Sequence, residues 1–173
     1  MNNPFELFDL PIAFEIDQQA LSSRYLALQK SLHPDNFVHA SSQEQRLSMQ
    51  KSAEINDALQ ILKDPIARTD CIIALNTGEQ VNVEEKSSRD LAFLMQQMEW
   101  REQLEELEQR NSLDELADFS QQIISQQREF LSQISSAVLA KNWQLAGQLN
   151  DRLRFIKKLI VEIERIEDKL AEF

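Results

Sequence analysis

The tripeptide His33-Pro34-Asp35 separates two long helical patterns and decides how the first half of the chain folds. Upstream, apolar residues recur at helical spacing, at Leu21, Tyr25, Leu28 and Leu32. Pro34 ends that helix, because proline has no N–H to donate and restricts the residue before it. We expect His33 at the C-terminal end of the helix, where the dipole tolerates a cationic ring. We expect Asp35 in the loop that follows, with its carboxylate free to meet a cation on a partner.

A second helical pattern follows the tripeptide after a short loop. Its apolar residues are Leu47, Ile55, Ala58, Leu59 and Leu62. Asp17 is expected to cap the first of the two helices, and Ser41 or Ser42 the second. Asp64, which precedes a proline at the first helical position, is expected to cap a further short helix.

Composition predicts an almost purely helical chain, because only two of 173 residues are glycine and four are proline. The formal net charge of −11 argues against nucleic acid and anionic membrane surfaces as partners. The charge is uneven. No acidic residue occurs between Gln18 and Pro34, where Arg24 and Lys30 form a small basic island. We therefore expect this helix to meet an acidic surface.

A single cysteine, Cys71, excludes an internal disulfide and a cysteine-rich zinc or iron–sulfur site, so no metal or cofactor is predicted. Cys71 lies in an apolar helical run and is interpreted as a small buried hydrophobe. The first residues lack signal-peptide and transit-peptide character, and no apolar run approaches a membrane span. We expect a cytoplasmic protein. No phosphate loop, metal-ligand cluster or nucleophile–base pair supports an enzyme.

The stretch Asn76-Thr77-Gly78-Glu79-Gln80 marks the predicted domain boundary, because it combines a glycine with amide and polar residues. The expected organisation is a first domain over residues 1–76, a linker over 77–86 and a helical bundle over 87–173.

Three long helices are expected in the second part of the chain. Ser87 with Asp90 approximates a capping box for the first of them, and Ser112 with Glu115 repeats the pattern for the second. Asn142 is expected to cap the third. Heptad seams run along the second and third helices, at Leu116, Ile123, Phe130, Ile134 and Ala137 and at Leu149, Leu153, Ile156, Ile160, Ile163 and Leu170. With short turns between them, these helices predict an antiparallel three-helix bundle and an all-α protein.

The helix expected from Ser88 to Arg110 carries more apolar surface than one seam needs. At about 100° per residue, one stripe holds Phe93, Trp100, Leu104 and Leu107, and a nearly opposite stripe holds Leu91, Leu94, Met95 and Met98. Acidic residues border the second stripe. A methionine-bearing patch with a charged rim is typical of a partner-binding face, but the pattern alone slightly favours packing against the other domain. Phe155, beside Arg154 on the last helix, is interpreted as an exposed contact or as a shield for the bundle's flank.

Two antiparallel helices joined by His33-Pro34-Asp35, with the stretch from Ile55 to Arg68 closing the second, resemble a J domain. The whole chain resembles the HscB family, the J-type co-chaperones of iron–sulfur cluster assembly. In the second half the resemblance is carried by Arg89-Asp90, Ala92-Phe93-Leu94-Met95, Glu99, Arg101-Glu102, Leu104-Glu105 and Leu153-Arg154-Phe155. The cysteine-rich repeats of general J proteins and the paired-cysteine module of many eukaryotic relatives are absent from this sequence, which favours a bacterial form.

The resemblance implies a non-enzymatic co-chaperone with two partners. The J domain would dock on the specialised heat-shock chaperone HscA and accelerate its ATP hydrolysis, with His33, Pro34 and Asp35 as the signalling loop. Arg24 and Lys30 would supply the basic docking face, and the loop aspartate would meet a chaperone arginine. The bundle would bind the cluster scaffold IscU. The family's scaffold-binding positions fall on Leu94, Met95, Met98, Glu99, Glu102, Glu106, Arg154 and Phe155.

One departure from the family pattern is Asn36, which stands where the family often has lysine. It removes a cation beside the loop, and the preceding helix is also less basic than in general J proteins. Both weaken the expected electrostatic contribution. An alternative function is a J-domain co-chaperone whose bundle holds unfolded clients in general. A purely structural coiled-coil protein would explain the seams but not the tripeptide, and the second apolar stripe is equally compatible with self-association.

Overall fold

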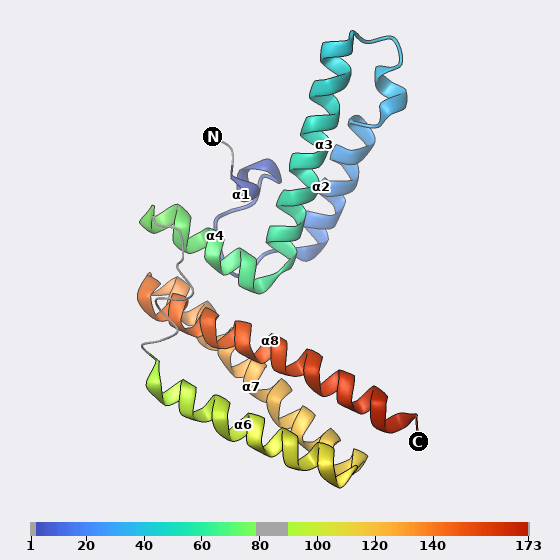
Figure 1. Ribbon diagram of the computed structural model, residues 1–173. Helices are drawn as coiled ribbons and strands as arrows, with labels where there is room; N and C mark the ends of the chain where they lie inside the picture. Colours follow the sequence, from blue (N-terminus) through green and yellow to red (C-terminus); the bar gives the residue numbers. More distant parts are fainter. Residues whose placement is uncertain (1–2, 79–89, 173) are drawn as a thin grey trace. The chain divides into compact units, whose positions relative to one another are not determined.

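The computed structural model describes residues 3–78 and 90–172 of the chain (Figure 1). Within these ranges every regular element is helical. The described residues form two compact units that divide between Ile72 and Ile73. Most of the predicted linker and the cap predicted at Ser87 lie outside the described residues. The domain limits derived from the sequence therefore stay a prediction.

The first unit is built on an antiparallel helical hairpin. Its elements are α1 (Pro4–Leu7), α2 (Gln18–Ser31), the short 3₁₀ helix η1 (Pro34–Phe37), α3 (Ser42–Lys63) and the start of α4 (Pro65–Thr77). Helices α2 and α3 lie side by side and η1 joins them (Figure 1). The predicted caps are confirmed, since backbone N–H groups of the first turns donate to the side chains of Asp17, Ser41 and Asp64.

Aromatic residues of the N-terminal segment close the core of the first unit. Phe5 and Phe8 are fully buried, and α1 packs against α3. The core also includes Phe14, Leu21, Ile55, Ala58, Leu59, Leu62 and Ile72. Helix α1 ends at Leu7, and Asp9 follows it with a φ of 53°. The carbonyl oxygens of Phe8 and Asp9 accept hydrogen bonds from Arg24 of α2, at 2.9 and 2.6 Å.

A chain of polar contacts fixes α2 against α3. The side-chain oxygen of Asn56 accepts hydrogen bonds from the Tyr25 hydroxyl at 2.7 Å and from the Gln29 amide at 2.9 Å. The Ser52 hydroxyl donates to Gln29 at 3.2 Å. Side-chain hydrogen bonds demand matched geometry, so they set the register of the two helices. The register in turn fixes where the connection between the helices lies.

The second unit contains three long helices, α6 (Leu91–Arg110), α7 (Leu113–Leu139) and α8 (Trp143–Ala171). The caps predicted at Ser112 and Asn142 are confirmed by hydrogen bonds from the Glu115 and Leu145 amides. The start predicted for α6 is wrong. Asp90 is the N-cap itself rather than a residue of the first turn, because its carboxylate accepts the backbone N–H of Phe93. Aspartate favours this position, where it satisfies an orphan donor of the first turn.

The bundle core is formed by the apolar faces of all three helices, with α7 and α8 in the most extensive contact. All five seam residues predicted on α7 are buried. On α8 the predicted seam is also buried, except that Leu159 is buried while Ile160 is only half-buried. The α6 residues predicted to face the core are buried as well, and they are Phe93, Trp100, Leu104 and Leu107. The antiparallel arrangement follows from the short turns (Figure 1).

Candidate protein-interaction sites

The residues from His33 to Phe37 form a compact turn between α2 and α3, which we name the His-Pro-Asp turn. Helix α2 ends at Ser31, and His33 is extended, with φ −58° and ψ 137°, as expected for a residue before proline. Pro34 then opens a 3₁₀ helix that contains Asp35. The predicted loop is thus an ordered turn, and His33 caps the new helix rather than the end of the preceding one. Its Nδ1 accepts the backbone N–H of Asp35 at 3.2 Å.

The turn presents its two ionisable side chains to solvent. The side chains of His33 and Asp35 are 60% and 87% exposed, and Nδ1 lies 3.5 Å from the nearer carboxylate oxygen. Because Nδ1 accepts a hydrogen bond from the backbone, the neutral imidazole carries its proton on Nε2. The carboxylate of Asp35 is open to a cation from another molecule. A guanidinium would suit it, since charge-assisted pairs with carboxylates are short and directional.

Asn36 fastens the turn to the end of α2. Its side-chain amide donates to the carbonyl oxygens of Lys30 at 2.8 Å and of Ser31 at 3.3 Å. These carbonyls belong to the last turn of the helix, where intrahelical donors run out. Asn36 therefore lacks the positive charge of the lysine that the family often has at this position, but its side-chain amide holds the His-Pro-Asp turn in place.

The two cations of the predicted basic face are not brought together. Lys30 is exposed next to the turn, but Arg24 directs its guanidinium at the carbonyls that follow α1. At about 100° per residue the two side chains leave α2 about 120° apart. The contribution of Arg24 to docking stays a prediction, and its contribution to the fold is visible in its hydrogen bonds.

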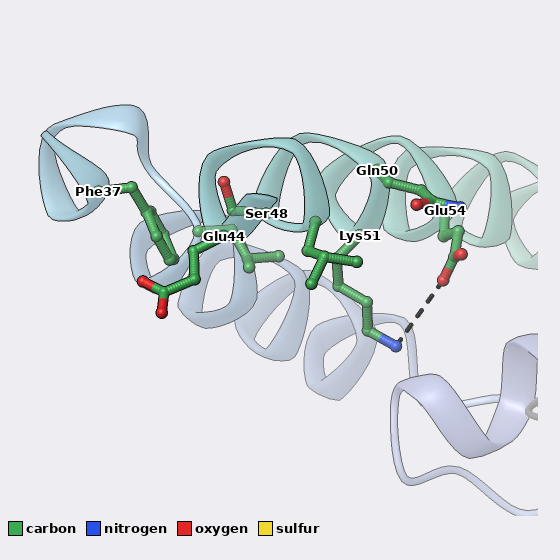
Figure 2. A pocket seen from close by; sticks show the side chains of 8 residues that line it. Phe37, Glu44, Ser48, Gln50, Lys51 and Glu54 are labelled. Carbon is green, nitrogen blue, oxygen red and sulfur yellow. Dashed lines mark ion pairs between the residues drawn. The ribbon is translucent and has the colours of Figure 1, made fainter. Parts of the chain in front are cut away.

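Two shallow hollows flank Phe37 at this end of the hairpin. One, of about 560 Å³, is lined by Leu32, Phe37, Glu44, Leu47, Ser48, Gln50, Lys51 and Glu54. Figure 2 shows its charged rim, where Lys51 and Glu54 lie 3.8 Å apart. The other, of about 600 Å³, includes Pro34 of the His-Pro-Asp turn. Most of their surface is apolar, and neither holds a set of groups suited to acid–base or metal chemistry.

The second predicted stripe of α6 is uncovered within the bundle. We name Leu91, Leu94, Met95 and Met98 the methionine stripe. Leu91, Met95 and Met98 are 70%, 66% and 70% exposed, and Leu94 is half-buried. The bordering acids are also exposed, at Glu99, Glu102 and Glu106. Apolar residues grouped on one exposed helix face, rather than scattered singly, indicate an interaction surface.

Phe155 is part of an aromatic cluster rather than a free-standing contact. Its ring stacks on Trp100, with centroids 6.3 Å apart, and meets Phe93 edge-on at 5.7 Å. The guanidinium of Arg101 lies 5.3 Å from the Phe155 ring centre. Phe93 and Trp100 belong to the buried stripe of α6, whereas Arg101 leaves that helix about 20° from Leu94, so Phe155 lies along the border between the two stripes.

Arg154, the other residue predicted on α8, is largely buried. Its side chain lies 3.8 Å from the carboxylate of Asp151, one turn earlier on the same helix. The α6 residues of the predicted scaffold site share one helix face, and Arg154 and Phe155 lie on α8. Binding by any of these residues stays a prediction.

An ion pair that the sequence analysis missed fixes the start of α6. Arg152 of α8 donates from Nε and Nη2 to the two carboxylate oxygens of Asp90, at 2.8 and 3.0 Å. The same guanidinium lies 5.2 Å from the Phe93 ring centre. The hydrogen bond from Arg152 is the main cause that holds the pKa of Asp90 below its usual value. The sequence pattern placed Asp90 in the first turn rather than at the N-cap, and it gave no sign of the partner 62 residues away.

Replacing Asp90 with Asn should lower the free energy of unfolding at neutral pH by about 1–2 kcal/mol, because a charge-assisted pair is lost while the cap remains. The pKa of Asp90 is lowered in the folded state, so its contribution is present above the ordinary carboxyl pKa and lost as pH falls through the lowered value. Unfolding by urea at several pH values tests this. The difference between the two chains should shrink below about pH 4. An equal change for Asp118→Asn, an exposed carboxylate on α7, or a difference that is independent of pH, would contradict it.

Nothing among the described residues indicates a reactive or metal-binding centre. No three His, Cys, Asp or Glu side chains of the described ranges gather closely enough to hold a metal ion. Cys71 is half-buried rather than fully buried, and burial together with the neighbouring Asp70 raises the pKa of its thiol. A raised pKa leaves little nucleophilic thiolate. None of the helices in residues 3–78 and 90–172 is long and apolar enough to cross a membrane.

Comparisons with known proteins agree along the whole chain. A family model described as the HSCB C-terminal oligomerisation domain matches residues 89–164. A co-chaperone protein HscB homolog from Mannheimia succiniciproducens is 69% identical over 173 residues, 100% of both chains. Another from Haemophilus influenzae is 51% identical over 172 residues, 99% of both chains.

Solved structures show the same fold. Chaperone HscB from Vibrio cholerae matches with a TM-score of 0.91 and 42% identity, covering 97% of this chain and 99% of that one. The human co-chaperone protein HscB matches with a TM-score of 0.87 and 27% identity, covering 95% and 82%. The predicted architecture of a J domain followed by a three-helix bundle is confirmed, and so is the predicted family. The chain belongs to the HscB family of co-chaperones.

Proposed function

We propose that this chain is a two-ended co-chaperone of iron–sulfur cluster assembly. One end stimulates the ATPase of the heat-shock chaperone HscA, and the other binds the scaffold IscU and delivers it to that chaperone. The chain itself performs no chemistry. The observation that carries the proposal is the exposed turn of His33, Pro34 and Asp35 at the end of a braced helical hairpin, in a chain whose relatives are co-chaperones.

The chaperone end acts by binding. A bound protein shifts a conformational equilibrium only as far as it prefers one state over the other. The contact of His33 with the Asp35 backbone and the hydrogen bond from the Asn36 amide hold the backbone of the His-Pro-Asp turn, which fixes where the Asp35 side chain begins. We expect an arginine of HscA to meet that carboxylate only in the conformation that hydrolyses ATP. Because the chain binds that conformation more tightly, it raises the population of the conformation and with it the rate of ATP hydrolysis.

The scaffold end is the methionine stripe with its acidic rim. Unbranched methionine side chains adapt to an irregular apolar surface, and Met95 and Met98 are free to do so. Glu99, Glu102 and Glu106 would pair with basic residues at the edge of the scaffold's surface, which favours encounter and orientation more than affinity. The aromatic cluster of Phe93, Trp100 and Phe155 packs α6 against α8.

Steady-state ATP hydrolysis by HscA tests the proposal with four samples: HscA alone, with the full chain, with IscU, and with both. The chain alone should stimulate, and the chain with IscU should stimulate by more than the two separate effects combined. An unchanged rate in every sample would overturn the proposal. Equal enhancement by IscU and by an unrelated unfolded polypeptide would instead support a general client-binding bundle.

A further inference from the structure

We infer that Leu26, together with Lys30, is the part of α2 that contacts the partner chaperone, and that Arg24 is not. The inference rests on the proposed function and names which side chains of that end make the contact. It replaces a docking face based on two cations with one based on an apolar side chain and a single cation. Three observations carry it, and they concern the hydrogen bonds of Arg24, the exposure of Leu26 and the absence of acids along the helix.

Arg24 is already used within the first unit. Its Nη1 donates to the carbonyl oxygens of Phe8 and Asp9, at 2.9 and 2.6 Å. Asp9 adopts a left-handed conformation, φ 53°, which is uncommon for a residue other than glycine. The guanidinium therefore holds the turn that follows α1, and with it the two buried phenylalanines of that segment. These two hydrogen bonds use Nη1 and fix the orientation of the guanidinium, so a partner could engage only its remaining N–H groups and only in that orientation.

Leu26 lies on a different face of α2. At about 100° per residue it is about 40° from Lys30 and about 160° from Arg24. Its side chain is 67% exposed, and the exposed residues around it on this face, Ser22 and Ser23, are small. A single exposed leucine is common on protein surfaces. Leu26 differs in its position, one helical turn before Lys30 and about 9 Å along the helix from the C-cap at Leu32.

This face is continuous with the His-Pro-Asp turn. The carbonyl of Lys30 accepts the amide of Asn36, so the last turn of α2 and the His-Pro-Asp turn are joined directly. No acidic residue lies between Gln18 and Pro34 to repel carboxylates on the partner. The occupant we assign is the surface of the chaperone that also meets Asp35, with an apolar depression for Leu26 beside a carboxylate for Lys30.

The assignment predicts weak dependence on salt. Salt screens ion pairs between exposed charges but not the burial of a leucine. A face with Lys30 as its one cation should lose little docking strength as ionic strength rises. A face that depended on Arg24 and Lys30 together would lose more.

The experiment titrates full-length variants into HscA and measures the concentration that gives half-maximal ATPase stimulation. Leu26→Ala should raise this concentration by about tenfold, because burying a leucine side chain in an interface increases affinity by about that factor. Leu26→Glu should raise it by more, because it also places a charge in the apolar contact. Arg24→Gln should change it by less than about twofold while lowering the midpoint of thermal unfolding. Leu139→Glu on α7, a change of the same kind at an 80% exposed leucine, is the matched control and should have no effect.

The outcomes separate this inference from the proposed function. Normal stimulation by the unmodified chain with an unchanged half-maximal concentration for Leu26→Glu would overturn the inference alone. A folded Arg24→Gln chain that docks more weakly than Leu26→Ala would also overturn it, as would an equal loss in Leu139→Glu. Absence of stimulation by the unmodified chain would overturn the proposed function and the inference with it.

Discussion

A chain with His33→Gln is expected to leave the ATPase rate of HscA close to its unstimulated value at every concentration tested. The imidazole Nδ1 holds the backbone of Asp35 at 3.2 Å and so fixes the turn that presents the carboxylate. Glutamine is more flexible and does not restore that geometry. The coupling free energy between two binding sites is typically about 1–3 kcal/mol, which corresponds to an effect of about 5- to 150-fold. We expect His33→Gln to remove most of the stimulation of ATP hydrolysis that such a coupling gives. Steady-state hydrolysis titrated with the variant measures the loss.

Two further variants show whether the loss belongs to the His-Pro-Asp turn. Asp35→Asn keeps the shape of the side chain but removes its charge, and it should abolish stimulation as well. Asp57→Asn, at an exposed carboxylate on α3 of the same hairpin, is the matched control and should stimulate normally. His33 is largely exposed, so circular dichroism should show all three chains folded. Full stimulation by folded His33→Gln would contradict the proposed mechanism.

The double variant Met95→Asp and Met98→Asp is expected to weaken binding of IscU by about 100-fold, or about 3 kcal/mol. Both side chains are exposed on one face of α6, so the change removes two apolar contacts without opening a cavity. It also adds negative charge beside an acidic rim, where unpaired carboxylates would be desolvated in the complex. Calorimetric titration of IscU into the full chain measures the affinity.

Met49→Asp is the matched control for this variant, because Met49 is a 69% exposed methionine on α3. It should bind IscU with unchanged affinity. Equal affinity for the double variant and the unmodified chain would show that the methionine stripe is not the scaffold site. Phe155→Ala is less informative. Its ring packs on Phe93 and Trp100, so its removal should destabilise the bundle and weaken binding together.

Much of the fold was predictable from the sequence because its signals are local. A cap such as Asp17 or Ser112 acts within three residues of itself, so the sequence alone indicates it. The two stripes of α6 follow from helical periodicity, which correctly separated buried Trp100 from exposed Met98. The His-Pro-Asp turn was placed correctly because proline restricts its neighbours wherever it occurs.

The features that the sequence did not predict depend on tertiary contacts. Nothing in the sequence indicates that the carbonyl oxygen of Asp9 accepts a hydrogen bond from Arg24, 15 residues later. The partner of Asp90 is 62 residues away on another helix. The same limit applies to Phe155, because periodicity gave its angle from the seam but not the aromatic rings beside it. Leu26 differs, because helical periodicity alone places this apolar side chain on an outward face of α2.

The central claim is that the scaffold-binding end and the chaperone-stimulating end must belong to the same chain. Mixing two chains, each defective at one end, tests this most directly. Chain one carries His33→Gln, and chain two carries Met95→Asp and Met98→Asp. The assay measures ATP hydrolysis by HscA in the presence of IscU. The IscU concentration is kept well below the one at which HscA responds to IscU alone. If one chain must both hold the scaffold and signal, the mixture should not regain the IscU-dependent enhancement given by the unmodified chain. Full recovery of that enhancement by the mixture would contradict the account.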